Sequence, residues 1–423
     1  MPTPSEIASS LLRPVLRPGI RTGCAVADAL RIVPRLEVSS LLRAAGRTAE
    51  QDPRAIEPLE AMLHTARDEL DLTAQGRVVL GTRFVRILQV RGWILDRSEA
   101  GDLPKSPITG PPIFVTGFPR TGTTLSHRIL ASATEALAPT WAEVMEPSLD
   151  PDRPTERARA NRLRRYRTAV RLMQVMSPGL RSVHEIVADG PEECTHLHEG
   201  AFDSESLALA GPCPAYRTWL AERDDRRRRE RYTWQNLCLR AILADREEAR
   251  RSGRWVLKAP QHLRQLDDLF AVFPDAVVVR LHRDPIATMA STASLVQHAS
   301  RITSRAFDPA VGEDLLDVFE EWQADGDDGM ARHADRVLEV RYDDLVGDPV
   351  GFVERVHHFA GIPVEGGHVD AVRTHLSRRP KHHFGRHRYS IGDYGLRADE
   401  VKERLAGYIA RVEAIPRFAG SGE

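Results

Sequence analysis

The feature that most constrains the fold is a short apolar run followed directly by a glycine-rich turn, at residues 113–124. The run at 113–115 follows two prolines and predicts a buried strand. Gly117 and Gly122 predict a tight loop, and the apolar periodicity over 125–130 predicts a helix after it. A strand, a glycine loop and a helix N-terminus together form an anion-binding cradle, because backbone N–H groups and the positive end of the helix dipole converge there.

The spacing of the glycines indicates which class of phosphate-binding loop this segment resembles. Gly117 and Gly122 are separated by four residues and followed by Thr123 and Thr124, as in a P-loop whose usual lysine is replaced by threonine. The cationic side chain of the loop is Arg120 instead. In NTPases the missing lysine reaches the β- and γ-phosphates beside a magnesium ion, so its absence argues against ordinary ATP hydrolysis.

The string Gly-Phe-Pro-Arg-Thr-Gly-Thr-Thr at 117–124 resembles the 5′-phosphosulfate loop of PAPS-dependent sulfotransferases. Its arginine form is similar to the loops of tyrosylprotein sulfotransferases and of many bacterial sulfotransferase-family proteins. The resemblance covers about residues 110 to 400 and implies PAPS as co-substrate, PAP as product and no metal. It also implies that the nucleotide is bound by Arg120, Thr121, Gly122, Thr123 and Thr124.

A second motif supplies candidate catalytic residues. The predicted strand at 255–257 ends in Lys258, and strand carboxyl ends face the ligand crevice of an open sheet. The resemblance implies that Lys258 contacts the transferring sulfuryl group. His262 follows at a helix start beside the same crevice, and an ordinary histidine pKa of ~6.5 suits a general base. Glu143, where related sulfotransferases often place a glutamate, is the other candidate base; we place His262 slightly ahead.

A third motif predicts the other end of the nucleotide site. Arg283 follows a predicted apolar strand at 276–281, and Ser291 lies eight residues further on. This spacing resembles the sulfotransferase 3′-phosphate site, and a guanidinium fork suits a phosphate dianion. Tyr342, at the end of a fourth predicted strand, is a further nucleotide-site candidate. Tyrosylprotein sulfotransferases have an arginine where this chain has Leu295, which weakens a tyrosylprotein acceptor.

The predicted elements define the fold class. Four strands separated by helices predict an α/β fold, with a P-loop-like, mostly parallel sheet flanked by helices. We expect an N-terminal helical region at 1–105 packed on the core, and a sulfotransferase-like PAPS-binding domain at 106–423. Short helices are expected at the N-terminus, interrupted by Pro14, Pro18 and Pro34.

Two further segments carry open alternatives. A Pro-Glu-Glu sequence at 191–193 is similar to one that lines the acceptor pocket in bacterial sulfotransferase-family proteins, which makes His184 a pocket candidate. The basic loop at 378–389 is either a solvated linker or a lid over the nucleotide. The arginine-rich stretch at 153–181 predicts a solvated amphipathic helix.

Composition sets the remaining limits. Lys+Arg (59) balances Asp+Glu (60), so net charge gives no attraction to nucleic acid or membrane. The four cysteines form no CxxC pair and no metal-ligand spacing, which favours free thiols in a reducing compartment. We expect no signal peptide and no transmembrane segment, and therefore a cytoplasmic protein.

The predicted function is transfer of the sulfuryl group from PAPS to a hydroxyl of a small-molecule or lipid acceptor. Arg120 and Lys258 would neutralise charge on the leaving phosphate without magnesium, because a sulfuryl group carries less negative charge than a phosphoryl group. The alternatives are a P-loop small-molecule kinase, which would bind ATP with magnesium, and a non-catalytic PAP-binding protein.

Overall fold

A five-stranded parallel sheet with strand order β2-β3-β1-β4-β5 forms the centre of the molecule. The structure is a computed structural model that describes residues 4–46, 53–106, 110–133, 135–247, 253–305, 311–364, 366–378 and 390–417. The strands are β1 (Ile113–Gly117), β2 (Ala136–Leu137), β3 (Arg254–Lys258), β4 (Val277–His282) and β5 (Val337–Arg341). All four predicted strands are present. The edge strand β2 was not predicted, because two residues carry no readable periodicity.

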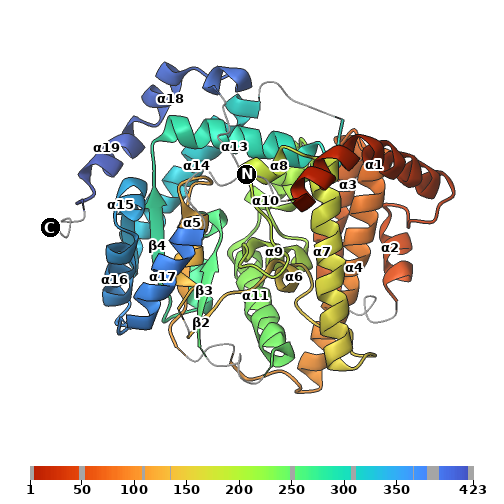
Figure 1. Ribbon diagram of the computed structural model, residues 1–423, viewed down its shortest axis with the longest axis horizontal. Helices are drawn as coiled ribbons and strands as arrows, with labels where there is room; N and C mark the ends of the chain where they lie inside the picture. The colour runs from red at the N-terminus through yellow and green to blue at the C-terminus, as the bar shows by residue number, and fades with distance from the viewer. Residues whose placement is uncertain are drawn as a thin grey trace.

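Helices cover both faces of this sheet, and a further group of helices lies to one side of it (Figure 1). They are α1 (Pro4–Ala29), α2 (Val38–Ala45), α3 (Ile56–Asp68), α4 (Ala74–Glu99), α5 (Thr123–Leu130), α6 (Trp141–Met145), α7 (Thr155–Met176), α8 (Leu180–Val183), α9 (Thr195–His198), α10 (Pro214–Ala221), α11 (Asp225–Asp245), α12 (Leu266–Val272), α13 (Pro285–Ser300), α14 (Val311–Arg332), α15 (Tyr342–Gly347), α16 (Pro349–Phe359), α17 (Gly366–Arg378), α18 (Ala398–Arg404) and α19 (Ala406–Ala414).

The alternation of side chains along β1 shows why both faces are covered. Ile113 and Val115 belong to a buried cluster with α5, α15, α16 and α17. Phe114 belongs to a second buried cluster with α4, α7, α11 and α12 on the other face. Successive strand residues point to opposite faces, so a strand that is apolar throughout needs a helical layer on each side. The predicted fold class is confirmed.

The N-terminal region differs from the expected short helices. Residues Pro4–Ala29 form one helix, α1, which continues through Pro14 and Pro18. Each proline removes one backbone donor, but its fixed φ is compatible with the helical region, so the helix continues at the cost of those bonds. Helices α2, α3 and α4 share a buried cluster with residues 202–220. The division of the chain at residue 105 stays a prediction.

Candidate active site

The loop after β1 requires glycine at two positions. Gly117 has φ 133° and Gly122 has φ 98°, both in the region that side chains disfavour. An added Cβ would lie 2.4 Å from the carbonyl oxygen of Leu281 at Gly117, and 2.7 Å from Cδ2 of Tyr342 at Gly122. The loop therefore packs against β4 and α15 with no space for side chains, and Gly122 forms the N-cap of α5.

Arg120 and Thr121 lie between these glycines, and both were predicted to bind the nucleotide. The structure gives the two side chains different roles. Arg120 adopts a left-handed φ of 71°, and its side chain lines the cavity described below. Thr121 is fully buried, and its hydroxyl donates to the carbonyl of Phe118 at 2.7 Å. Thr121 thus closes the turn, while Thr123 and Thr124, at the start of α5, line the cavity.

The residues predicted for the two ends of the nucleotide meet in the structure. Arg283 Nη1 donates to the carbonyl oxygen of Arg120 at 3.0 Å, and Arg120 Nε donates to Ser291 Oγ at 3.0 Å. The Arg283 guanidinium lies 4.3 Å from the ring centroid of Tyr342. On the other side, the Tyr408 hydroxyl accepts from the backbone N–H of Arg283 at 3.1 Å. Four predicted site residues therefore form one connected group at the carboxyl ends of β1 and β4.

Lys258 stands at the carboxyl end of β3, as predicted, and is paired with a glutamate that the sequence analysis did not select. The Lys258 side chain is 1% exposed, and its ammonium forms an ion pair with Glu193, while Glu192 lies 4.0 Å away. Burial raises the pKa of Glu193, but the charge and hydrogen bond of Lys258, together with the charge of His184, outweigh burial, so the pKa is lowered. Glu193 and His184 both line the cavity, and His184 Nε2 lies 3.5 Å from Glu192.

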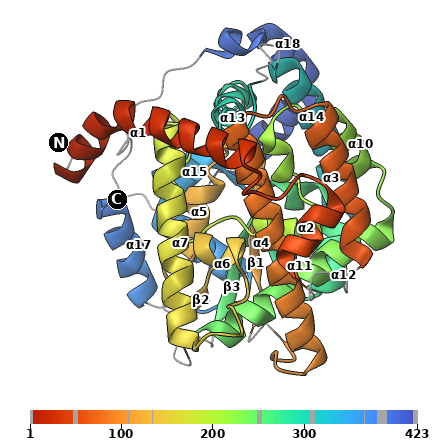
Figure 2. The ribbon, with the colours of Figure 1, turned by 90° about the vertical axis from the view of Figure 1, so that its right-hand side faces the viewer.

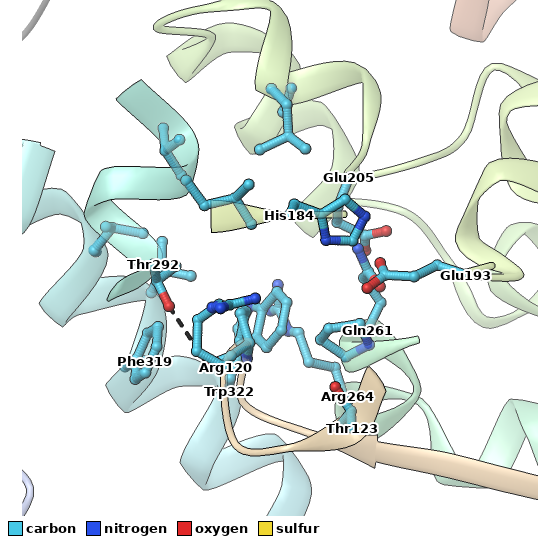
Figure 3. Close-up of a pocket in the computed structure, with 18 of the residues that line it drawn as sticks. Arg120, Thr123, His184, Glu193, Glu205, Gln261, Arg264, Thr292, Phe319 and Trp322 are labelled. Atoms are coloured by element: carbon cyan, nitrogen blue, oxygen red, sulfur yellow. Dashed lines mark hydrogen bonds between the residues drawn. The ribbon is translucent and has the colours of Figure 1, made fainter. Parts of the chain in front are cut away.

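Arg120, Arg283, Tyr342, Glu193 and His184 line one cavity of about 390 Å³ (Figure 3), whereas Lys258 and Ser291 are buried behind its lining. Its polar part contains Arg120, Thr123, Glu193, Glu205 and Arg264, which Figure 3 labels. The apolar wall, from α13 and α14, consists of Leu295, Val296, Leu315, Val318, Phe319 and Trp322; Thr292 and Glu321 of the same helices also line the cavity, and Arg264 lies 6.0 Å from the Trp322 ring centroid. The volume lies within the range of small-molecule sites, and the division suits a ligand with a charged end and an apolar end.

His262 was ranked first as general base, and the structure argues against that role. Its ring is fully buried: the Tyr232 hydroxyl lies 2.9 Å from Nδ1, and Cys194 Sγ lies 3.0 Å from Nε2. Burial, with a smaller contribution from a nearby arginine, lowers its pKa to about 3. The short 3₁₀ turn Pro260–Arg264 directs Gln261 into the cavity and His262 into the core.

Glu143 is also absent from the cavity lining. Its carboxylate accepts from the backbone N–H of Thr140 in a capping box and from Arg246 at 2.9 and 2.8 Å. Burial raises the pKa of Glu143, but Arg246 reverses this effect and the pKa is lowered. A carboxylate held in this way stabilises the start of α6, and the structure gives it no access to an acceptor.

Two further expectations concern the surroundings of the site. Residues 379–389, the core of the predicted basic lid, lie outside the described residues. Within the part of the chain that is described, no helix is long and apolar enough to cross a bilayer.

Comparison with known proteins agrees with this geometry. The model of the sulfotransferase family matches residues 111–366, so the chain belongs to that family. It is a PAPS-dependent sulfotransferase with a nucleotide-binding fold, and these matches favour neither the kinase nor the non-catalytic alternative.

Individual relatives come from mycobacteria. The chain is 28% identical, over 289 residues, to the omega-hydroxy-beta-dihydromenaquinone-9 sulfotransferase Stf3 of Mycobacterium bovis and of Mycobacterium tuberculosis, covering 64% of this chain and 68% of the relative. It superposes on the crystal structure of sulfotransferase STF1 from M. tuberculosis with a TM-score of 0.71 and 29% identity, over 88% of this chain and 98% of STF1. STF9 from Mycobacterium avium (TM-score 0.69, 21% identity, 88% and 96% coverage) shares the fold.

Proposed function

We propose that this sulfotransferase transfers the sulfuryl group of PAPS to the hydroxyl of an elongated apolar acceptor, and that it works in the cytoplasm. The observation that carries the proposal is the lining of the cavity, which is divided between charged groups, including Arg120, Arg283 and Glu193, and aliphatic and aromatic side chains from α13 and α14. Stf3, by its name, acts on an ω-hydroxylated dihydromenaquinone, a molecule with that same division. Three buried unpaired cysteines, Cys194, Cys213 and Cys238, fit a reducing compartment.

In this proposal the nucleotide lies along the carboxyl edge of the sheet. The loop 120–124 and the start of α5 receive the phosphosulfate, because backbone N–H groups at a helix N-terminus favour an anion. Arg283 and Ser291 hold the second phosphate, and Tyr342 lies against the Arg283 guanidinium on the same side.

Glu193 is the general base of the proposed reaction. It removes the proton of the acceptor hydroxyl as the new oxygen–sulfur bond forms and the bond from sulfur to the phosphate oxygen of PAPS breaks. Arg120 and Lys258 stabilise the charge on that departing oxygen. When Lys258 turns from Glu193 toward the nucleotide, its lowering effect on the pKa of Glu193 is lost. Burial and the neighbouring charge of Glu192 still raise that pKa, so it moves up from its lowered value toward that of a useful base.

The test is labelled-sulfate transfer from PAPS to a series of primary alcohols that differ only in chain length, with PAP binding measured in parallel. We expect kcat/KM to rise with chain length as the apolar wall is filled. A matched variant, Val318→Asp, places a charge in that wall and should abolish the chain-length dependence while PAP affinity stays the same. Transfer that is independent of chain length in the wild-type enzyme would overturn the apolar acceptor.

A further inference from the structure

The exposed large apolar side chains of this protein are concentrated at one place. Among the residues whose side chains the structure describes, which in α1 begin at Leu16, six such side chains are exposed, and four of them lie in α1 and the turn after it: Leu16 (47%), Val26 (49%), Leu30 (67%) and Ile32 (69%). A fifth, Leu172, belongs to α7, which packs against α1. Isolated exposed apolar residues are ordinary, but a local group of them marks an interaction surface.

The arrangement along α1 places these residues on the outer side of the helix. Leu16, Val26 and Leu30 follow helical spacing and form one strip on the outer side. The neighbouring face, which includes Ile20 and Ala27, is partly buried against the body of the protein. Figures 1 and 2 show α1 lying across the outside of α4 and α7.

The charge around the strip is positive, although the whole chain is nearly neutral. Residues 16–37 contain four arginines, at positions 17, 21, 31 and 35, and two acidic residues, Asp28 and Glu37. Asp28 already accepts a bond from Arg77 at 2.6 Å, and Glu37 lies 3.7 Å from Arg35 in an exposed ion pair, so a net positive charge remains. A second copy docked symmetrically on this strip would bring arginine against arginine, whereas an anionic lipid surface complements both the charge and the apolar side chains.

The strip also lies close to the acceptor side of the cavity. Ile20, on the inner face of α1, packs against a small cluster formed by Met176, Leu180 and Ile302. Leu295 packs against the same cluster and lines the apolar wall of the cavity. One layer of side chains, the cluster of Met176, Leu180 and Ile302, therefore separates the inner face of α1 from the wall that the proposed acceptor would contact.

We propose that the α1 surface, defined as Leu16, Val26, Leu30, Ile32 and Leu172 with the arginines at 31 and 35, docks the enzyme on an anionic phospholipid membrane. The docked helix would lie in the plane of the interface, with its apolar strip among the acyl chains and its arginines at the headgroups. The link to acceptor delivery rests on the proposed function; the docking itself does not.

The experiment is co-sedimentation of the full-length protein with vesicles of phosphatidylcholine and phosphatidylglycerol, with vesicles of phosphatidylcholine alone as the lipid control. We expect binding to the anionic vesicles and a loss of at least about ten-fold in partitioning for the double variant Leu30→Asp/Ile32→Asp. The double variant Arg31→Gln/Arg35→Gln should weaken binding to the anionic vesicles by about ten-fold or more, since each basic residue near such a surface adds attraction. The matched control is Val364→Asp, because Val364 is the one exposed large apolar residue outside the α1 surface among those described.

The outcomes separate the two proposals. If wild-type protein does not bind anionic vesicles, or Leu30→Asp/Ile32→Asp binds as well as Val364→Asp does, membrane docking is wrong. If sedimentation velocity shows a dimer that the Leu30→Asp/Ile32→Asp change dissociates, the surface binds a second copy and docking is again wrong. Sulfate transfer to a detergent-dispersed alcohol requires no vesicle, so its absence would refute the proposed function and leave the vesicle result standing. Calorimetry with PAP confirms that each variant is folded.

Discussion

Replacing Arg283 by alanine tests the nucleotide site directly, because the structure gives this side chain two separable contributions. One is the phosphate contact that we propose, a charge-assisted hydrogen bond worth roughly 1.5–3 kcal/mol. The other is the 3.0 Å bond from Arg283 Nη1 to the carbonyl of Arg120, which holds the loop and is worth about 1 kcal/mol as a neutral-acceptor bond. Together they predict a loss of about 3 kcal/mol, equivalent to PAP binding on the order of 100-fold weaker.

Isothermal calorimetry with PAP measures this loss without any need for the acceptor. Arg283→Lys keeps the charge but loses the planar fork, so its affinity should lie between those of wild type and Arg283→Ala. Arg301→Ala, at the C-cap of α13 and outside the cavity lining, is the matched control and should bind PAP as wild type does. If Arg283→Ala binds PAP with wild-type affinity while remaining folded, the assignment of this end of the nucleotide site is wrong.

Three more measurements test other parts of the site. Glu193→Gln should lower kcat by about 10²- to 10⁴-fold with little change in PAP affinity. Glu143→Gln should instead lower the unfolding temperature and leave kcat nearly unchanged. The reverse pattern would restore Glu143 as the base. Gly122→Ala places a Cβ 2.7 Å from Cδ2 of Tyr342 at a φ of 98°. PAP affinity should therefore fall, and the free energy of unfolding in denaturant titrations should drop by roughly 1–3 kcal/mol. Wild-type values for both quantities would contradict the tight packing of the loop. His262 has a folded-state pKa of about 3, below its unfolded value of ~6.5, so its contribution to stability is complete above pH ~6.5 and is lost toward pH 3 at about 1.4 kcal/mol per pH unit. The free energy of unfolding, followed by circular dichroism, should therefore fall less steeply with decreasing pH in His262→Gln than in the wild type. An unchanged pH slope would refute the burial argument.

The positions that the sequence placed correctly are those fixed by strand ends. Arg120, Lys258, Arg283 and Tyr342 each lie in or directly beside a segment where a parallel strand ends. All carboxyl ends of such a sheet face one edge, so knowing the strands was enough to bring these residues together. Ser291 was selected because its eight-residue spacing from Arg283 resembles the 3′-phosphate site of the family, and the structure adds a contact with Arg120 that was not predicted.

The general base could not be predicted in the same way, because side-chain direction inside a turn depends on local backbone geometry. Pro260–Arg264 forms a 3₁₀ turn, in which adjacent residues point in directions about a third of a turn apart. Gln261 consequently lines the cavity while His262, its neighbour, packs into the core. His262 was selected because an ordinary histidine has a pKa near neutrality. Burial lowers the pKa of His262 and so removes the property for which it was selected.

Glu193 was missed for a complementary reason, since it lies on no strand end and on no regular helix face. It belongs to the connection between α8 and α9, and its position depends on contacts with distant parts of the chain. Cys194 N–H donates to the carbonyl of Lys258 at 2.9 Å, and Glu192 N–H donates to the carbonyl of Pro139 at 3.0 Å. These bonds hold the connection against the end of β3, which is why the Glu193 carboxylate meets the Lys258 ammonium. Two acidic residues after a proline were visible in the sequence, but only the tertiary hydrogen bonds determine that the second one, Glu193, faces the cavity. The base selected by position in the fold, Glu193, therefore differs from the base selected by residue type, His262.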